Sequence, residues 1–183
     1  MKYLSIPFIV LFISFGFAQD KYLTKTGTVT FEASVPSFEE VKGKNENTTA
    51  ILNTENGEFA ALVLVKGFRF KNALMEEHFN ENYAESDDFP KATFKGTIKD
   101  FNFKALTTSN TIVVFNGSLT FHGETKILKN MPLNISISKE NILSVSGDFI
   151  ADVSDFAIEI PKIVSNKLSK NVIVNYQFKL SEK

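Results

Sequence analysis

The chain has 183 residues, a formal net charge of −1 and no cysteine. This length predicts a single domain with a sizeable core. The near-zero charge argues against nucleic acid or an anionic membrane surface as the main partner. The lack of cysteine excludes disulfides, thiol catalysis and thiolate metal sites. Nineteen phenylalanines without any tryptophan favour an apolar interior that needs few hydrogen-bond partners.

Residues 1–18 have the pattern of a signal peptide. A basic start and an apolar run lead to a small–x–small cleavage triplet, Gly16-Phe17-Ala18. The run of about 14 apolar residues is too short to cross a bilayer, which takes roughly 20. Cleavage would leave residues 19–183 as one domain with 19 basic and 21 acidic side chains, a net charge of −2, because one lysine is removed. We therefore expect a periplasmic or secreted protein with no integral membrane span after processing.

Alternation of apolar and polar side chains predicts about eight strands. They are Gly27 to Val35, Thr49 to Asn53, Glu58 to Phe70, Lys91 to Lys99, Thr111 to His122, Pro132 to Ser138, Asn141 to Ala151 and Asn171 to Leu180. Residues 38–47 are charged, lack this period and are expected to be irregular. The third strand is apolar on both faces from Phe59 to Val65, which predicts a cover on both sides, by an outer helix or a partner subunit.

The stretch at about 72–83 is the place where strand alternation stops, and it predicts one short helix. Asn72 suits the N-cap, and Glu76 lies in the first turns, near the positive end of the helix. Met75 and Phe79 are four residues apart and therefore share a face. We expect this helix to lie near a barrel mouth and to act as its plug or lid.

Three glycines favour a closed barrel over a sandwich. Gly96, Gly117 and Gly147 all fall in the apolar phase of their strands, where a packed sandwich prefers a side chain. The predicted fold class is therefore all-β, an eight-stranded antiparallel barrel with one short helix. The interior of such a barrel is either filled by side chains or holds one small ligand.

Aromatic residues of the inward phase are the candidates for lining that interior. They are Phe31, Phe94, Phe115, Phe121, Phe149 and Tyr176, and the helix adds His78 and Phe79. The alternative is that the phenylalanines are ordinary core.

The sequence predicts no catalytic residue, no metal site and no cofactor. The two histidines, His78 and His122, lie on different elements and have no metal-ligand spacing. We interpret His78 as a partly buried residue bonded to a loop backbone or as a contact for a ligand head group, and His122 as a structural hydrogen bond at a turn. A hydrolase is the least favoured alternative, because no nucleophile–base pair is visible.

Two segments together resemble the signatures of the YceI-like family. The first is the helix-to-strand stretch with Leu74-Met75-Glu76-Glu77-His78-Phe79, Asn82-Tyr83 and Phe89-Pro90-Lys91-Ala92-Thr93-Phe94. The second is the hairpin Gly117-Ser118-Leu119-Thr120-Phe121-His122-Gly123-Glu124-Thr125-Lys126, and Asp155-Phe156-Ala157-Ile158 also matches the family. The resemblance runs from about Gly27 to Leu180. Family members often carry a tryptophan near the mature N-terminus, where this chain has Tyr22 as the candidate replacement.

The resemblance implies a lipocalin-like barrel that holds a long isoprenoid or lipid chain, is exported to the periplasm, and often forms a homodimer. It implies no catalysis. We therefore interpret the chain as an exported binding protein for a polyisoprenoid or fatty-acyl chain. The alternative is a filled barrel that acts as a non-catalytic structural or protein-interaction module.

Overall fold

The computed structural model describes residues 21–183, so the signal peptide predicted for residues 1–18 lies outside the described part of the chain. The strands are β1 (Lys21–Ser34), β2 (Lys42–Asn53), β3 (Glu58–Leu64), β4 (Arg69–Phe70), β5 (Lys91–Ile98), β6 (Thr111–Phe121), β7 (Glu124–Ile137), β8 (Leu143–Asp152) and β9 (Leu168–Glu182). The helix α1 (Ala73–His78) continues into a π-helical turn, Phe79–Tyr83, which confirms the helix predicted at about 72–83. Short 3-10 turns lie at Val65–Gly67, Phe103–Ala105, Val153–Phe156 and Lys162–Val164.

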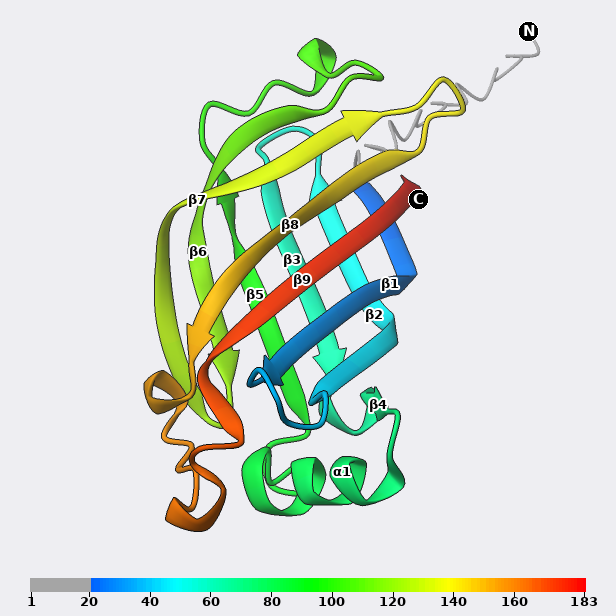
Figure 1. Cartoon of the computed structure of the whole chain (residues 1–183). Coiled ribbons are helices and arrows are strands. Elements are labelled where there is room, and N and C mark those ends of the chain that lie inside the picture. Colours follow the sequence, from blue (N-terminus) through cyan, green and yellow to red (C-terminus); the bar gives the residue numbers. More distant parts are fainter. Residues whose placement is uncertain (1–20) are drawn as a thin grey trace, which may run out of the picture.

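The strands form one closed antiparallel barrel (Figure 1). Their order is β1-β9-β8-β7-β6-β5-β3-β2, and β1 pairs with β2 to close the ring. The two-residue β4 pairs with the start of β2. The predicted eight-stranded antiparallel barrel is therefore confirmed. Closure removes the unpaired sheet edges that an open sheet would present.

Strands β1 and β7 begin earlier than the sequence pattern predicts, because each contains a bulge. In β7, Leu128 and Met131 both pack against the core although they are three residues apart. The register shifts between them, and Asn130 has φ +54° there. A bulge adds a residue and reverses the alternation beyond it, so the first part of each strand falls out of phase with the rest.

Most of the segment predicted to be irregular, residues 38–47, belongs to strand β2. Its two inward positions there are Gly43 and Asn45, both buried. The amide Nδ2 of Asn45 donates to the Leu64 carbonyl at 3.0 Å, and its Oδ1 accepts from the Asn47 amide at 2.8 Å. The prediction was wrong because the buried face here is built from glycine and a hydrogen-bonded amide, which leave no apolar alternation.

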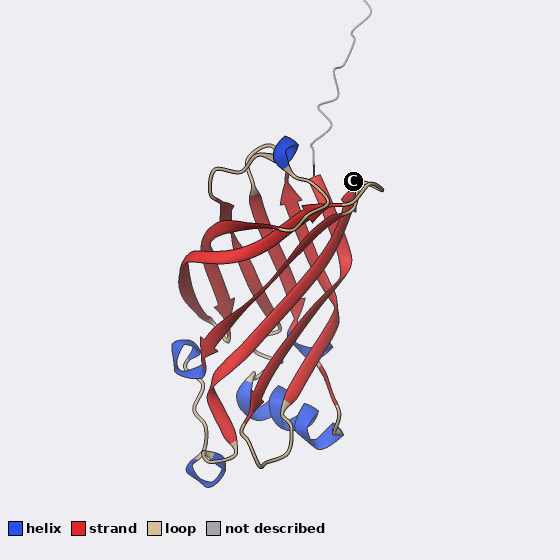
Figure 2. Cartoon of the chain, turned by 45° about the horizontal axis from the view of Figure 1, so that its top comes forward, coloured by secondary structure: helices blue, strands red, loops and turns tan. Residues whose placement is uncertain are grey.

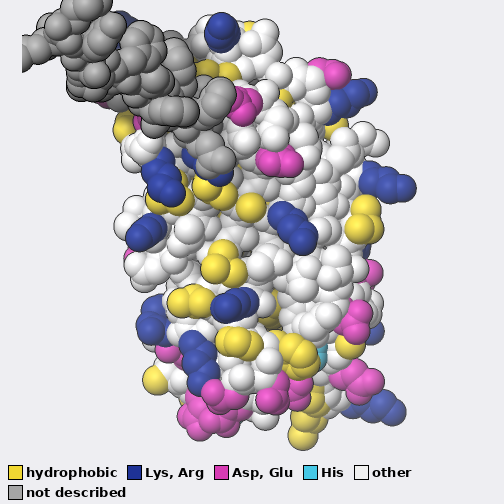
Figure 3. Space-filling view, turned by 180° about the vertical axis from the view of Figure 1, so that it is seen from behind, with side chains coloured by type: hydrophobic (Ala, Val, Ile, Leu, Met, Phe, Trp, Pro, Cys, Tyr) yellow, Lys and Arg dark blue, Asp and Glu magenta, His cyan; other side chains and the backbone are white. Residues whose placement is uncertain are grey.

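Strand β3 also departs from the prediction. It ends at Leu64 rather than at Phe70, since Val65–Gly67 forms a 3-10 turn. The outer face is open: Leu62 is 36% exposed and Leu64 is 54% exposed. No segment of residues 21–183 covers that face, so the prediction of an outer helix was wrong. Figure 3 shows apolar and basic side chains interspersed on the back of the barrel, with acidic side chains gathered at the α1 end.

The half of the barrel away from α1 is filled. Its fully buried side chains include Leu52, Ile98, Leu133, Ile135, Leu143 and Leu180. The loop at residues 99–110 covers this end, with Phe103 packed 5.4 Å from Tyr22 between ring centroids. Figure 2 shows α1 lying across the opposite end.

Candidate ligand-binding cavity

The half of the barrel next to α1 encloses a cavity of about 510 Å³. Its wall comes from the inner faces of β1, β3, β5, β6, β8 and β9, from α1 and its π-helical turn, and from the segment 153–169. The charged or titratable polar side chains on this wall are Glu39, His78, Tyr83, Lys167 and Tyr176, and the rest is largely aliphatic and aromatic. A concave, mostly apolar pocket of this size is typical of sites for small apolar molecules.

Seven of the eight residues predicted to line the interior do line this cavity. They are Phe31, His78, Phe79, Phe94, Phe121, Phe149 and Tyr176. The strand period therefore identified the inward direction correctly on several separate strands. Contact of these residues with a ligand stays a prediction.

Phe115 is the exception, and its assignment as a lining residue was wrong. Its side chain is fully buried and lies behind Phe94, with the two rings stacked 4.6 Å apart. It does not form part of the cavity wall. The alternation of a strand gives the direction of a side chain but not its depth along the barrel, so the pattern could not separate core from cavity.

The helix is held to the barrel at both ends. At its start, the Asn72 side chain accepts from the Leu74 amide at 2.9 Å, which confirms the predicted N-cap. Glu76 accepts from Arg69 Nη1 at 3.0 Å and from the Phe70 amide at 3.2 Å, which links α1 to β4. These bonds fix the helix against the barrel rim, where it forms part of the cavity wall.

At the end of α1, the Phe79 ring completes an aromatic cluster. Its centroid lies 5.1 Å from that of Phe31, 5.7 Å from that of Phe68 and 5.2 Å from that of Phe70. The cluster joins β1, β4 and the helix by apolar contact. Phe79 therefore has a structural part in addition to its place on the cavity wall.

His122 has the structural role that the sequence predicted. It has φ +48° at the tight turn between β6 and β7. Its Nδ1–H donates to the Phe156 carbonyl at 2.9 Å, and its Nε2 lies 2.9 Å from Glu85 Oε2. Both partners are acceptors, so the ring satisfies both when both nitrogens carry protons. The Phe89 ring packs 4.5 Å from the imidazole. His122 thus connects three segments at the α1 end.

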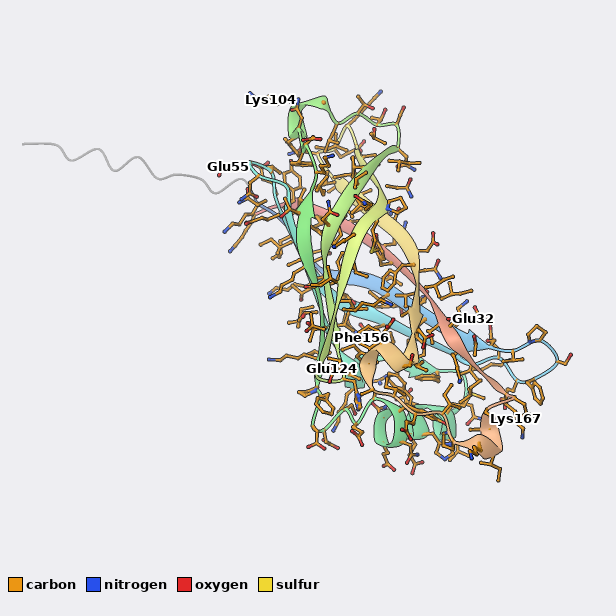
Figure 4. All side chains as sticks on the ribbon, turned by 90° about the vertical axis from the view of Figure 1, so that its left-hand side faces the viewer. Glu32, Glu55, Lys104, Glu124, Phe156 and Lys167 are labelled. Carbon is orange, nitrogen blue, oxygen red and sulfur yellow. The ribbon has the colours of Figure 1, made fainter. Side chains whose placement is uncertain are left out.

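His78 differs from the expected loop-bonded histidine. It is exposed, and its ring has no hydrogen-bond partner within residues 21–183. It lies on the cavity wall together with Glu39 and Lys167. Figure 4 shows Lys167 at the α1 end of the barrel and Lys104 at the far end. These three polar side chains are the candidates for contact with the polar end of an apolar ligand.

Tyr176 is the most buried polar residue of the cavity wall. It is only 6% exposed, and its hydroxyl has no hydrogen-bond partner among the described residues. Burial, together with the nearby Asp148 carboxylate, raises the pKa of Tyr176 to about 12. The phenol therefore stays neutral at ordinary pH, and the interior carries no charge at this depth.

The sequence analysis missed the part of the wall that is not strand. Phe156, Ile158, Ile160 and Val164 come from the segment between β8 and β9, and Phe68 comes from the stretch between the 3-10 turn Val65–Gly67 and β4. The signal was present as a concentration of isoleucine and valine in residues 158–164. It follows neither a strand nor a helix period, so periodicity alone could not place it.

Two further observations concern the described range, residues 21–183. There, no group of histidine and carboxylate side chains is arranged to hold a metal ion. No helix in this range has the length and apolarity needed to span a membrane.

The fold and cavity define a small, closed antiparallel barrel with an internal site of ligand size. The YceI-like domain model matches residues 21–180, so the chain belongs to the YceI-like family. The resemblance seen in the two sequence signatures is therefore confirmed. No curated protein sequence gives a significant match.

Solved structures share this fold, among them the following three. A polyisoprenoid binding domain from Saccharophagus degradans has a TM-score of 0.77 at 14% identity, covering 90% of this chain and 99% of that one. Burkholderia cenocepacia BcnA has a TM-score of 0.64 at 12% identity, covering 82% and 94%. The Campylobacter jejuni YceI protein has a TM-score of 0.56 at 13% identity, covering 81% and 88%. At such identities the likeness concerns the fold.

Proposed function

We propose that this protein is an exported carrier that holds one long apolar molecule, a polyisoprenoid or fatty-acyl chain, inside its barrel. The observation that carries the proposal is the cavity of about 510 Å³ with its largely apolar wall. Binding would be driven by removal of apolar area from water, at roughly 25 cal/mol per Å². The name of the Saccharophagus degradans neighbour, a polyisoprenoid binding domain, supports this class of ligand.

Binding without catalysis is part of the proposal. His122, which matches the hairpin signature, contacts the Phe156 carbonyl through Nδ1 and Glu85 through Nε2. His78 lies on a different element, helix α1, and its ring has no hydrogen-bond partner among residues 21–183. A carrier of this kind needs an apolar interior and a polar rim, both of which are present here.

A pair of adjacent residues in β9 tests the proposal. Val174 lines the cavity, whereas Ile173 points outward and is 47% exposed. Val174→Asp places a charge in the cavity and should abolish binding of a fluorescent fatty acid, while Ile173→Asp should bind as the wild type does. Organic extraction of wild-type protein purified from a bacterial periplasm should also yield a lipid. Equal binding by both variants would refute the proposed site.

Export and assembly belong to the same proposal. Intact mass of periplasmic protein should correspond to a chain that starts at Gln19, and a retained segment 1–18 would refute processing at that site. We further propose a homodimer, in which a second copy covers the outer face of β3. Sedimentation should then give twice the monomer mass, and Leu64→Lys should restore the monomer because Leu64 is 54% exposed on that face.

The alternative, a filled barrel that serves as a structural or interaction module, has one observation in its favour. The half of the barrel away from α1 is filled by side chains. The cavity in the other half favours the carrier instead. A periplasmic preparation without lipid, together with failure to bind any apolar probe, would favour this alternative.

A further inference from the structure

A layer of aromatic rings crosses the barrel between its hollow and filled halves. We call it the aromatic floor and define it as Phe94, Tyr176 and Phe178, which face the cavity, and Phe59 and Phe115 behind them. The rings form a connected set across β5, β9, β3 and β6. Centroid distances are 4.6 Å for Phe94–Phe115, 5.8 Å for Phe94–Tyr176, 5.7 Å for Tyr176–Phe178 and 5.7 Å for Phe59–Phe178.

Inward glycines leave the space that three of these rings occupy. An added Cβ would lie 2.5 Å from the Tyr176 hydroxyl at Gly147, 2.3 Å from Phe178 Cδ1 at Gly27, and 2.6 Å from the Phe115 ring at Gly117. No side chain fits at such distances, so each glycine provides the space that one ring fills. The floor therefore depends on the backbone, because a bulkier residue at any of these glycines would collide with a ring.

Beyond the floor there is no room for a ligand. Phe59 and Phe115 form the side of the floor that faces the filled half, and neither lines the cavity. The next side chains along the barrel, among them Leu52, Leu133 and Leu143, have at most 1% exposure. The cavity therefore has a closed end at the floor, and an apolar chain can extend only from the α1 end to that point.

The closed end sets a limit on chain length, because carbons beyond the length of the cavity gain no further buried area. We infer that the aromatic floor makes the site selective for a single chain of limited length, an acyl chain or a short prenyl chain. Longer polyisoprenoids would leave their remaining units in water. This inference rests on the proposed function, because it concerns the same cavity.

A series of saturated fatty acids tests the limit on delipidated wild-type protein, from lauric through palmitic and stearic to arachidic and behenic acid. Competition with a fluorescent fatty acid gives each Kd. Affinity should rise about fourfold for each added methylene while the chain still gains buried length. It should then stay level beyond one chain length within the series. A rise that continues through behenic acid would overturn the limit and leave the carrier function standing. No binding by any acid would refute the carrier function itself.

Two variants connect the limit to the floor. Phe94→Ala removes a ring of the floor and should increase the chain length at which the affinity stops rising. Phe70→Ala removes a half-buried ring near α1. It should lower the affinity for all acids by a similar factor without changing the chain length at which the affinity stops rising. If folded Phe94→Ala keeps the wild-type limit, the floor does not set chain length. The wild-type series tests the chain-length limit even if Phe94→Ala does not fold.

Discussion

Ionisation of Tyr176 should destabilise the barrel in alkaline solution. Its phenol is 6% exposed and has no hydrogen-bond partner among residues 21–183. Burial is the larger cause of the raised pKa, and repulsion between the phenolate and Asp148 is the second. In the unfolded chain both causes disappear, so the phenol there ionises with its ordinary pKa.

The sign and size follow from the two pKa values, about 12 in the folded protein and 10.0 as the reference. Below pH 10 the phenol is neutral in both states and contributes no pH dependence. Between pH 10 and 12 the unfolded state loses its proton first, so the free energy of unfolding falls with rising pH. One pKa unit corresponds to about 1.4 kcal/mol, which gives a total loss of about 3 kcal/mol. That is a large share of a typical stability of about 5–15 kcal/mol.

The assay is urea unfolding of the wild type and of Tyr176→Phe between pH 8 and 12. Lysines and the other tyrosines titrate in the same range, but they are common to both proteins and cancel in the difference. At pH 8 the variant should be equal to the wild type or more stable, because it removes an unpaired buried hydroxyl. Its advantage should grow by about 2 kcal/mol as pH rises to 12, where half of the folded phenol is ionised. A constant difference across that range would refute the reasoning.

Two further variants test structural contacts. His122→Ala should lower the free energy of unfolding by about 1–3 kcal/mol, because it removes hydrogen bonds to two other segments, and should speed amide exchange at Val153–Phe156. Unchanged exchange there would show that the histidine does not hold that turn. Gly96→Ala should cost about 1–3 kcal/mol or more, because the new Cβ would lie 2.2 Å from a backbone oxygen of the neighbouring strand. Outward Thr97→Ala is the matched control, with a change of about 0.5 kcal/mol or less, and equal effects of the two would contradict the close approach.

Period two was sufficient to predict most of the strands, because they have one apolar and one polar face, and inward glycines then favoured a barrel. It failed where another interaction replaced apolar burial. In β2 the inward Asn45 is satisfied by the Leu64 carbonyl, so burial there left no hydrophobic signal. In β7 the bulge at Asn130 reversed the phase. Both failures are local and did not alter the topology.

The sequence predicted which strand residues point into the barrel, but not which of them line the cavity. Phe94 and Phe115 have the same phase on neighbouring strands, yet the first lines the cavity and the second lies behind it. Their difference depends on strand register, which pairs Phe94 with Leu119 and Phe115 with Ile98. The segment 158–164 was missed because it lacks a period. Its position is set by the tertiary contacts of the preceding turn, including that of His122 with Phe156.

The division of the barrel into a filled half and a hollow half has a consequence for sequence variation. Most of the fully buried side chains, such as Leu143 and Leu180, lie in the half that contains no cavity. Substitutions along the hollow half can therefore change the shape of the internal space while most of the packed core is left intact. Stability and ligand preference can then evolve semi-independently within one short chain. Relatives with the same backbone could accept quite different molecules.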